Sequence, residues 1–186
     1  NPRLYGYIEE FDDFYPDENG NIKKKIILKV SDYRSALIQG KFLAKKGLWV
    51  SEYRIESGLN CGGHAFATDG HLMGPILAHF RDNKEDLVSE IHSVLVRALS
   101  HRKRHVPQSI LPVKVSAQGG VGTSEEHDFL LEHYKLDSVG WGSPFLLVPE
   151  ATTVDNTTLT KLAQAEAKDL YLSNISPLGV PFNSLR

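Results

Sequence analysis

The chain has 186 residues, 41% of them hydrophobic, which is enough for one domain with a well-buried core. Its formal net charge of −2 provides no general attraction to nucleic acid or to a membrane surface, so neither is expected as a partner. The single cysteine excludes an internal disulfide framework. Together with the lack of a leader-like start and of an apolar run near about 18 residues, it favours a cytoplasmic protein.

The first regular pattern along the chain is a strand–helix–strand unit. Residues 1–25 mix aromatic with acidic side chains, and we expect them to be an irregular lead-in. Residues 26–30 are a short run typical of a buried strand. Asp32 is suited to cap a helix over residues 33–46, and residues 48–55 have the pattern of the next strand. A helix between two strands predicts a parallel βαβ unit.

A polar loop, Glu-Ser-Gly-Leu-Asn-Cys-Gly-Gly-His, follows this second strand at residues 56–64. His64 comes after two glycines, and an imidazole titrates near neutral pH, so the residue is suited to general acid–base catalysis. A histidine that bonds loop carbonyls is the alternative. Cys61 is a candidate nucleophile or redox thiol, or else a small side chain that fills a turn. Glu56 is expected to orient His64 or to bind a ligand hydroxyl, or to be an ordinary strand-end carboxylate.

Helical spacing returns after this loop and predicts a long helix, with apolar positions at Leu87, Val88, Ile91, Val94, Leu95, Ala98 and Leu99. The pattern ends in the basic run His-Arg-Lys-Arg-His at residues 101–105. Such a run is found in nucleic-acid patches, but cations are also favoured at a helix C-terminus by the helix dipole. No aromatic residues interleave with the basic ones, so we favour the second interpretation.

A second βαβ unit lies within residues 112–145. A short strand at 112–116 leads into a glycine-rich turn at 118–122, and Thr123 with Glu126 forms the pattern of a capping box. The next strand, at 137–140, ends in the sequence Gly-Trp-Gly-Ser. Glycines allow a backbone to approach a ligand closely, and the N–H groups of a helix N-terminus attract anions. The sequence therefore predicts a phosphate site at these two turns.

The remainder of the chain adds one further helix pattern, which Asp155 is suited to cap and which runs to Leu170. The tail after it is rich in turn-forming residues. Strands that alternate with helices along the chain predict an α/β fold with a parallel sheet or barrel.

Four segments together resemble landmarks of the nitronate monooxygenase group, which includes the 2-nitropropane dioxygenases and the FMN-dependent enoyl-acyl-carrier-protein reductases. The segments are ESGLNCGGHAF, KVSAQGGVGTSEE, DSVGWGSPFLLVPEAT and the tail ISPLGVPFNSLR. Their order and spacing match the group over roughly residues 26–186. A single glycine-rich segment of this kind would be a weak signal.

The resemblance implies a TIM-type (β/α)8 barrel that holds FMN at its C-terminal face. His64 would be the catalytic histidine, and Glu56, Asn60 and Cys61 would lie in the substrate pocket. No metal is implied. Gln118 would contact the flavin or make a structural hydrogen bond at the strand end. The FMN phosphate would be held by residues of both turns: Gly119, Gly120, Gly122, Gly140, Gly142 and Ser143.

Only four strands of such a barrel can be counted, near residues 26–30, 48–55, 112–116 and 137–140. We therefore expect residues 1–186 to be a single α/β domain, the C-terminal half of a (β/α)8 barrel from a longer chain. The partner at its open sheet edges would be the missing N-terminal half or a second copy of the chain.

The expected function is that of an FMN-dependent oxidoreductase acting on a small molecule, a nitronate monooxygenase or an enoyl reductase. Two alternatives remain open from the residues. One is a non-catalytic barrel domain that binds a phosphate-bearing ligand within a larger protein. The other is thiol chemistry by Cys61 and His64.

Overall fold

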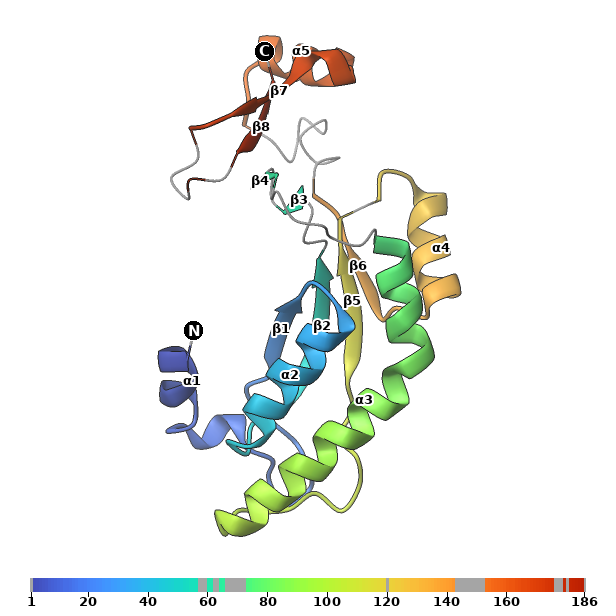
Figure 1. The fold of residues 1–186 in the computed structure, drawn as a ribbon. Coiled ribbons are helices and arrows are strands. Elements are labelled where there is room, and N and C mark those ends of the chain that lie inside the picture. Colours follow the sequence, from blue (N-terminus) through green and yellow to red (C-terminus); the bar gives the residue numbers. More distant parts are fainter. Residues whose placement is uncertain are drawn as a thin grey trace.

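The fold has two parts, a four-stranded parallel sheet with its helices and a smaller four-stranded antiparallel sheet (Figure 1). The structure is a computed structural model. It describes residues 2–56, 60–61, 64–65, 73–119, 121–142, 153–175, 179 and 181–185. The small sheet lies beyond the carboxyl ends of the parallel strands (Figure 1).

The parallel sheet has the strand order β1-β2-β5-β6. Its strands are β1 (Ile26–Val30), β2 (Val50–Glu56), β5 (Lys114–Gln118) and β6 (Ser138–Gly140). Each strand pairs in parallel with the strand that follows it in this order. Consecutive strands are thus neighbours, as in a barrel, whereas an open doubly wound sheet reverses its order partway along the chain.

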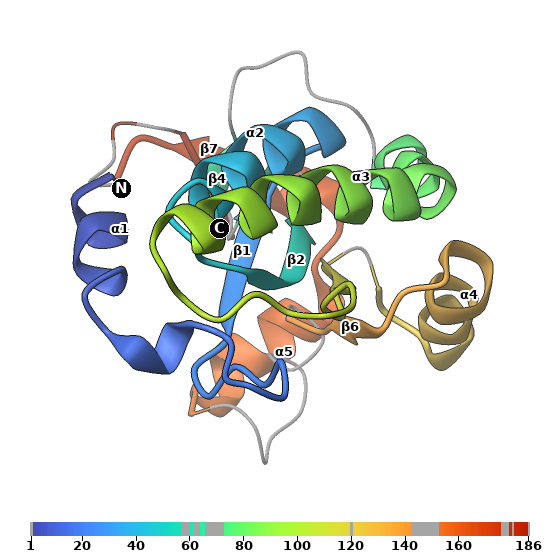
Figure 2. The ribbon, with the colours of Figure 1, turned by 90° about the horizontal axis from the view of Figure 1, so that it is seen from below.

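Three helices alternate with these strands: α2 (Tyr33–Ala44), α3 (Met73–His101) and α4 (Ser124–Tyr134). Figures 1 and 2 show α2 and α3 side by side over one face of the sheet, with α4 beside α3. Asp32 caps α2 by accepting the N–H of Ser35 at 2.7 Å. Pro75 lies in the first turn of α3, where its missing N–H is tolerated. Among the described residues, no helix is apolar enough over a sufficient length to cross a membrane.

The core lies between the parallel sheet and the helices α2 and α3. Alternate residues of the strands point into it, among them Tyr53 and Ile55 of β2, and both are almost fully buried. The helices bury Leu43, Leu77, Phe80, Leu87, Ile91, Leu95 and Leu99 against them. The described residues therefore contain a well-buried hydrophobic core.

The opposite face of the parallel sheet is polar and partly open. It carries the other set of alternate residues: Ile27 and Lys29 of β1, Glu52, Arg54 and Glu56 of β2, Lys114, Ser116 and Gln118 of β5, and Ser138 of β6. Ile27 is 57% exposed. We call this surface the open face.

The small sheet has the order β3-β4-β8-β7 and was not expected from the sequence. It combines β3 (Asn60–Cys61) and β4 (His64–Ala65) with β7 (Leu170–Ser173) and β8 (Phe182–Leu185). The helix capped by Asp155, α5, covers Asn156–Gln164 and ends six residues before Leu170. The expected extension to Leu170 is wrong, because a 3-10 turn (Ala167–Asp169) follows α5 and Leu170 then pairs with Leu185.

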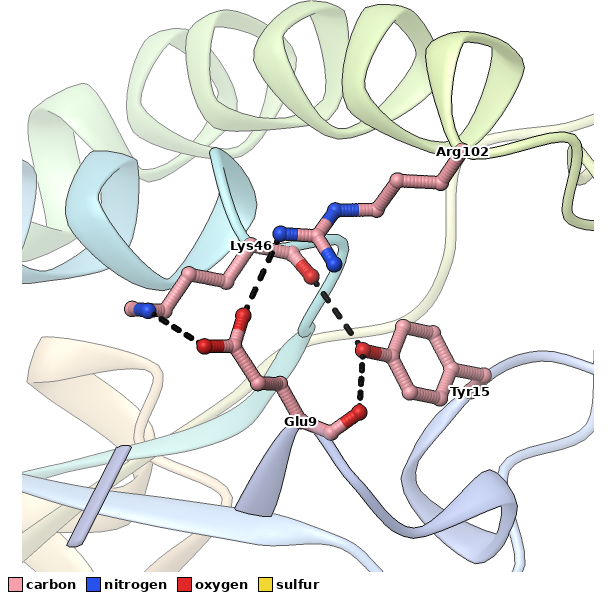
Figure 3. Close-up of polar contacts among 4 residues, drawn as sticks. All are labelled: Glu9, Tyr15, Lys46 and Arg102. Carbon is pink, nitrogen blue, oxygen red and sulfur yellow. Dashed lines mark hydrogen bonds and ion pairs between the residues drawn. The ribbon is translucent and has the colours of Figure 1, made fainter. Parts of the chain in front are cut away.

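The expected irregular lead-in over residues 1–25 is wrong in part. Residues Pro2–Ile8 form helix α1, and Asp12–Phe14 form a 3-10 turn. This segment is fixed by contacts with distant residues, which Figure 3 shows around Glu9. The Glu9 carboxylate accepts from Lys46 Nζ at 2.8 Å and from Arg102 at 3.2 Å. Tyr15 is buried, and its hydroxyl donates to the Glu9 carbonyl at 2.9 Å.

The basic run at the end of α3 takes part in the same arrangement. Arg102 pairs with Glu9, and Arg104 pairs with Asp12 at 2.9 Å. The guanidinium of Arg104 also lies 3.6 Å from the centre of the Tyr15 ring. Both arginines therefore hold the N-terminal segment against the end of α3, a role that local sequence reasoning did not assign to them.

Candidate functional site

The two glycine-rich turns meet at the carboxyl ends of β5 and β6. Gln118 and Gly140 are paired residues in the two strands. The N–H of Gly119 donates to the carbonyl of Gly140 at 3.1 Å, so the backbones of the two turns are joined directly. The expectation that these turns lie together is thereby met. Ser143 and Gly120, which were expected to take part, lie outside the described residues.

Both turns leave space beside their backbones. Gly119 has a φ of +84°, a conformation that other residues rarely adopt. A Cβ atom built on Gly119 or on Gly142 would meet no described atom within 4 Å. A ligand can therefore approach the backbone at these two positions, as a phosphate does in glycine-rich turns.

The first turn already holds an anionic group of the protein. Glu126 accepts the N–H of Gly122 at 2.7 Å and the N–H of Thr123 at 3.2 Å. The hydroxyl of Thr123 accepts the N–H of Glu126 at 3.2 Å, which completes the predicted capping box. The turn thus presents N–H groups in a geometry that an anion accepts, but a phosphate at Gly122 must displace the Glu126 carboxylate.

The second turn is attached to helix α4 through Trp141. Its indole Nε1 donates to Nδ1 of His127 at 2.9 Å. Because His127 lies one turn into α4, this bond holds the Gly140–Gly142 turn close to the N-terminus of the same helix. Both turns are therefore positioned by α4.

Gln118 packs over Gly140. A Cβ at Gly140 would lie 2.5 Å from Oε1 of Gln118, so the absence of a side chain at 140 makes room for the amide. The two roles that the sequence left open for Gln118, a flavin contact and a structural hydrogen bond at the strand end, both remain predictions.

Glu56, at the end of β2, forms an ion pair with Lys29 of β1 at 3.0 Å. Its carboxylate is thus engaged on the open face, as an ordinary strand-end carboxylate can be. Whether it also acts on His64 remains a prediction.

His64 belongs to the small sheet. It pairs with Cys61 across the β3–β4 ribbon and with Phe182 of β8. These short strands lie between the carboxyl ends of the parallel sheet and the β7–β8 pair (Figure 1). The side chains of Asn60, Cys61 and His64 lie outside the description, so their catalytic and pocket roles remain predictions.

The open face contains polar residues that sequence reasoning missed. Ser116 donates to Glu52 at 2.5 Å across β5 and β2. Arg54 lies between Glu52 and Glu56 on the same side of β2. The signal was present in the sequence, since Glu52, Arg54 and Glu56 alternate with the buried Tyr53 and Ile55.

A sizeable hollow of the described structure lies at the other end of the sheet. It has a volume of about 800 Å³ and is lined by the turn at Asn19–Ile22, the amino ends of the strands and the loop at Pro107–Pro112. It contains none of the predicted site residues. Chemistry in parallel α/β folds is found at the carboxyl ends of the strands, so we place the candidate site at the β5–β6 turns.

Comparison of the chain with protein-family models, with curated proteins and with solved structures finds no match. The structure by itself defines a mixed α/β fold, in which the strands of a four-stranded parallel sheet alternate with helices. The described residues contain no group of three or more His, Cys, Asp or Glu suited to hold a metal ion.

Proposed function

We propose that the chain is the C-terminal half of a (β/α)8 barrel and that the β5–β6 turns bind the phosphate of FMN. The sequence resemblance to the nitronate monooxygenase group supports this proposal. The consecutive parallel strand order supports it as well, because four such strands in sequence are what half of a barrel contains.

The observation that carries the proposal is the junction of the two turns. Gly119 and Gly142 lie at the carboxyl ends of neighbouring strands, and a Cβ at either position would meet no described atom within 4 Å. The adjacent N–H groups of Gly122 and Thr123 already donate to a carboxylate, that of Glu126. Shape and donors therefore fit a phosphate, with Glu126 rotating away as the phosphate binds.

FMN would supply the redox chemistry, and the residues of this chain would hold and surround it. Gly119 and Gly142 would allow the phosphate to approach the backbone, and Trp141 would keep the second turn against α4. His64 would act as the acid or base of an oxidoreductase on a small nitronate or enoyl substrate. Cytoplasmic location is part of the same proposal.

The second candidate is a barrel domain that binds a phosphate-bearing ligand without redox chemistry. The hydrogen bond from the Gly122 N–H to the Glu126 carboxylate favours this candidate over a function unrelated to anions. It shows that the turn can bind an anionic group, and it says nothing about a flavin ring.

The test compares FMN with riboflavin, which lacks the phosphate. Each flavin is titrated into the full chain, and the change in flavin absorbance and fluorescence gives its dissociation constant. Several charged hydrogen bonds to the phosphate make FMN bind at least ~100-fold more tightly than riboflavin. Equal affinity for both flavins, or binding of neither, contradicts the proposal. Competition by inorganic phosphate without flavin binding favours the second candidate.

A further inference from the structure

The open face holds an arginine, Arg54, that forms no ion pair with a described residue. The Nε–H of Arg54 is buried and has no acceptor in the described structure. Arg54 as a residue is only half-buried, but a buried Nε–H without an acceptor is destabilising, and an anion that accepts this bond would be its complement.

The two carboxylates nearest to Arg54 along its strand are already engaged. Glu52 accepts the hydroxyl of Ser116 at 2.5 Å, and Glu56 pairs with Lys29 at 3.0 Å. Each lies two residues from Arg54 on the same side of β2, roughly 6–7 Å away along the strand. Neither carboxylate is within ion-pair distance of the guanidinium.

The charges of the open face have a positive excess. Lys29, Arg54 and Lys114 contribute three positive charges, and Glu52 and Glu56 contribute two negative ones. The described strand residues of this face thus carry one positive charge in excess, and a single carboxylate would neutralise it. The planar fork of a guanidinium also matches a carboxylate, which it binds through two parallel N–H bonds.

The position of Arg54 suits a small ligand at the carboxyl end of the sheet. Arg54 is in register with Ser116 and Ser138, and two residues further along the strands are Glu56, Gln118 and Gly140. The arginine is therefore about 6–7 Å along the strands from the row that leads into the glycine-rich turns. A small organic anion on the open face would lie beside whatever occupies those turns.

We propose that Arg54 and the open face around it bind the carboxylate group of a small organic anion. The site is distinct from the two glycine-rich turns and does not require a flavin. This proposal rests in part on the proposed function: if FMN binds at those turns, the anion at Arg54 is the substrate of the oxidoreductase, and the substrate is then a molecule that carries a carboxylate.

The test follows the Nε–H of Arg54 by NMR in the full chain labelled with ¹⁵N-arginine, with the signal assigned through the backbone of Arg54. Acetate is added at constant ionic strength, with chloride as the comparison anion. The expected result is a saturable shift of the Arg54 signal with acetate and a smaller, non-saturating one with chloride. Equal shifts with both anions would overturn the proposal, and this measurement requires no variant.

Two variants sharpen the test. Arg54→Lys keeps the charge but loses the fork, and acetate affinity is expected to fall at least ~10-fold. Lys114→Gln removes a charge from the same face without touching the fork, and a loss of less than ~3-fold is expected because Lys114 is exposed. Unchanged affinity in Arg54→Lys, or inorganic phosphate binding more than ~10-fold tighter than acetate, would overturn the carboxylate assignment.

Discussion

Gly40 is the position where the packing of the core makes the sharpest prediction. It lies on α2, where the helix crosses Tyr53 of β2 and Ile91 of α3. A Cβ at position 40 would be 2.3 Å from Oη of Tyr53 and 2.5 Å from Cδ1 of Ile91. Tyr53 is 1% exposed, so its ring has little room to move, whereas Cδ1 of Ile91 is the end of a flexible side chain. A side chain at position 40 therefore requires the Tyr53 ring or the helix to shift.

The change Gly40→Ala is expected to lower the free energy of unfolding. Overpacking of a core typically removes about 1–3 kcal/mol. The higher helix propensity of alanine returns up to about 1 kcal/mol. We expect a net loss of about 1–2 kcal/mol, measured by urea unfolding followed by circular dichroism. The matched control is Gly6→Ala in α1, where a Cβ would meet nothing within 4 Å and no loss is expected.

A second change separates the steric cause from other effects. The hydroxyl of Tyr53 is buried without a hydrogen-bond partner in the described structure, and burial raises its pKa above the usual value for tyrosine. Tyr53→Phe removes this hydroxyl and is expected to stabilise the fold by about 1 kcal/mol. It also removes the atom nearest to the new methyl group, so Gly40→Ala should be less damaging in that background. An equal loss in both backgrounds would refute the steric explanation.

Two further predictions concern local contacts. Hydrogen bonding to Lys46 and its positive charge lower the pKa of Glu9, as does Arg102, against the opposing effect of burial. The stabilisation is therefore complete above the pKa of the unfolded carboxyl, about 4.3, and is lost as the pH falls through the lower folded-state pKa. Glu9→Gln should lower the free energy of unfolding by about 1–2 kcal/mol at pH 7. Urea unfolding should show that the difference between the variant and the unchanged chain shrinks below pH ~4. A difference that stays constant with pH contradicts this prediction. Asp32→Ala should lower the free energy of unfolding by about 1 kcal/mol because the α2 cap is lost, whereas Asp32→Asn should lower it little. Equal losses in the two variants contradict the capping role.

The parts of the fold that could be predicted from the sequence are those with local signals. The strand at residues 26–30 is found with its expected bounds, because it is a short apolar run between polar turns. The caps at Asp32 and Asp155 and the capping box of Thr123 and Glu126 are also as expected, since each involves residues three apart.

The parts that could not be predicted depend on contacts between distant residues. Helix α1 and the turn that follows it are held by Lys46, Arg102 and Arg104, and nothing in residues 1–25 indicates these partners. The small sheet likewise joins His64 to Phe182, more than a hundred residues further along the chain. Pairing of this kind is a tertiary property that local propensity does not encode.

The candidate site shows the same division. The joining of the two glycine-rich turns follows from parallel neighbouring strands, so the sequence pattern was sufficient to predict it. The engagement of Gly122 by Glu126 was not anticipated, although both belong to the predicted helix start. The role proposed for Arg54 depends on two contacts that the sequence did not indicate, the hydrogen bond from Ser116 to Glu52 and the ion pair of Lys29 with Glu56.

The most direct test of the central claim repeats the FMN titration with two variants of Gly142, where a Cβ would meet no described atom within 4 Å. Gly142→Ala adds a methyl group only, whereas Gly142→Asp adds a carboxylate where the phosphate is expected. Two like charges about 4–5 Å apart near a protein surface repel by roughly 3–4 kcal/mol, which corresponds to a loss of at least ~100-fold in affinity. The account predicts this loss for Gly142→Asp and nearly unchanged affinity for Gly142→Ala. FMN binding of equal strength in both variants would contradict a phosphate site at the β5–β6 turns.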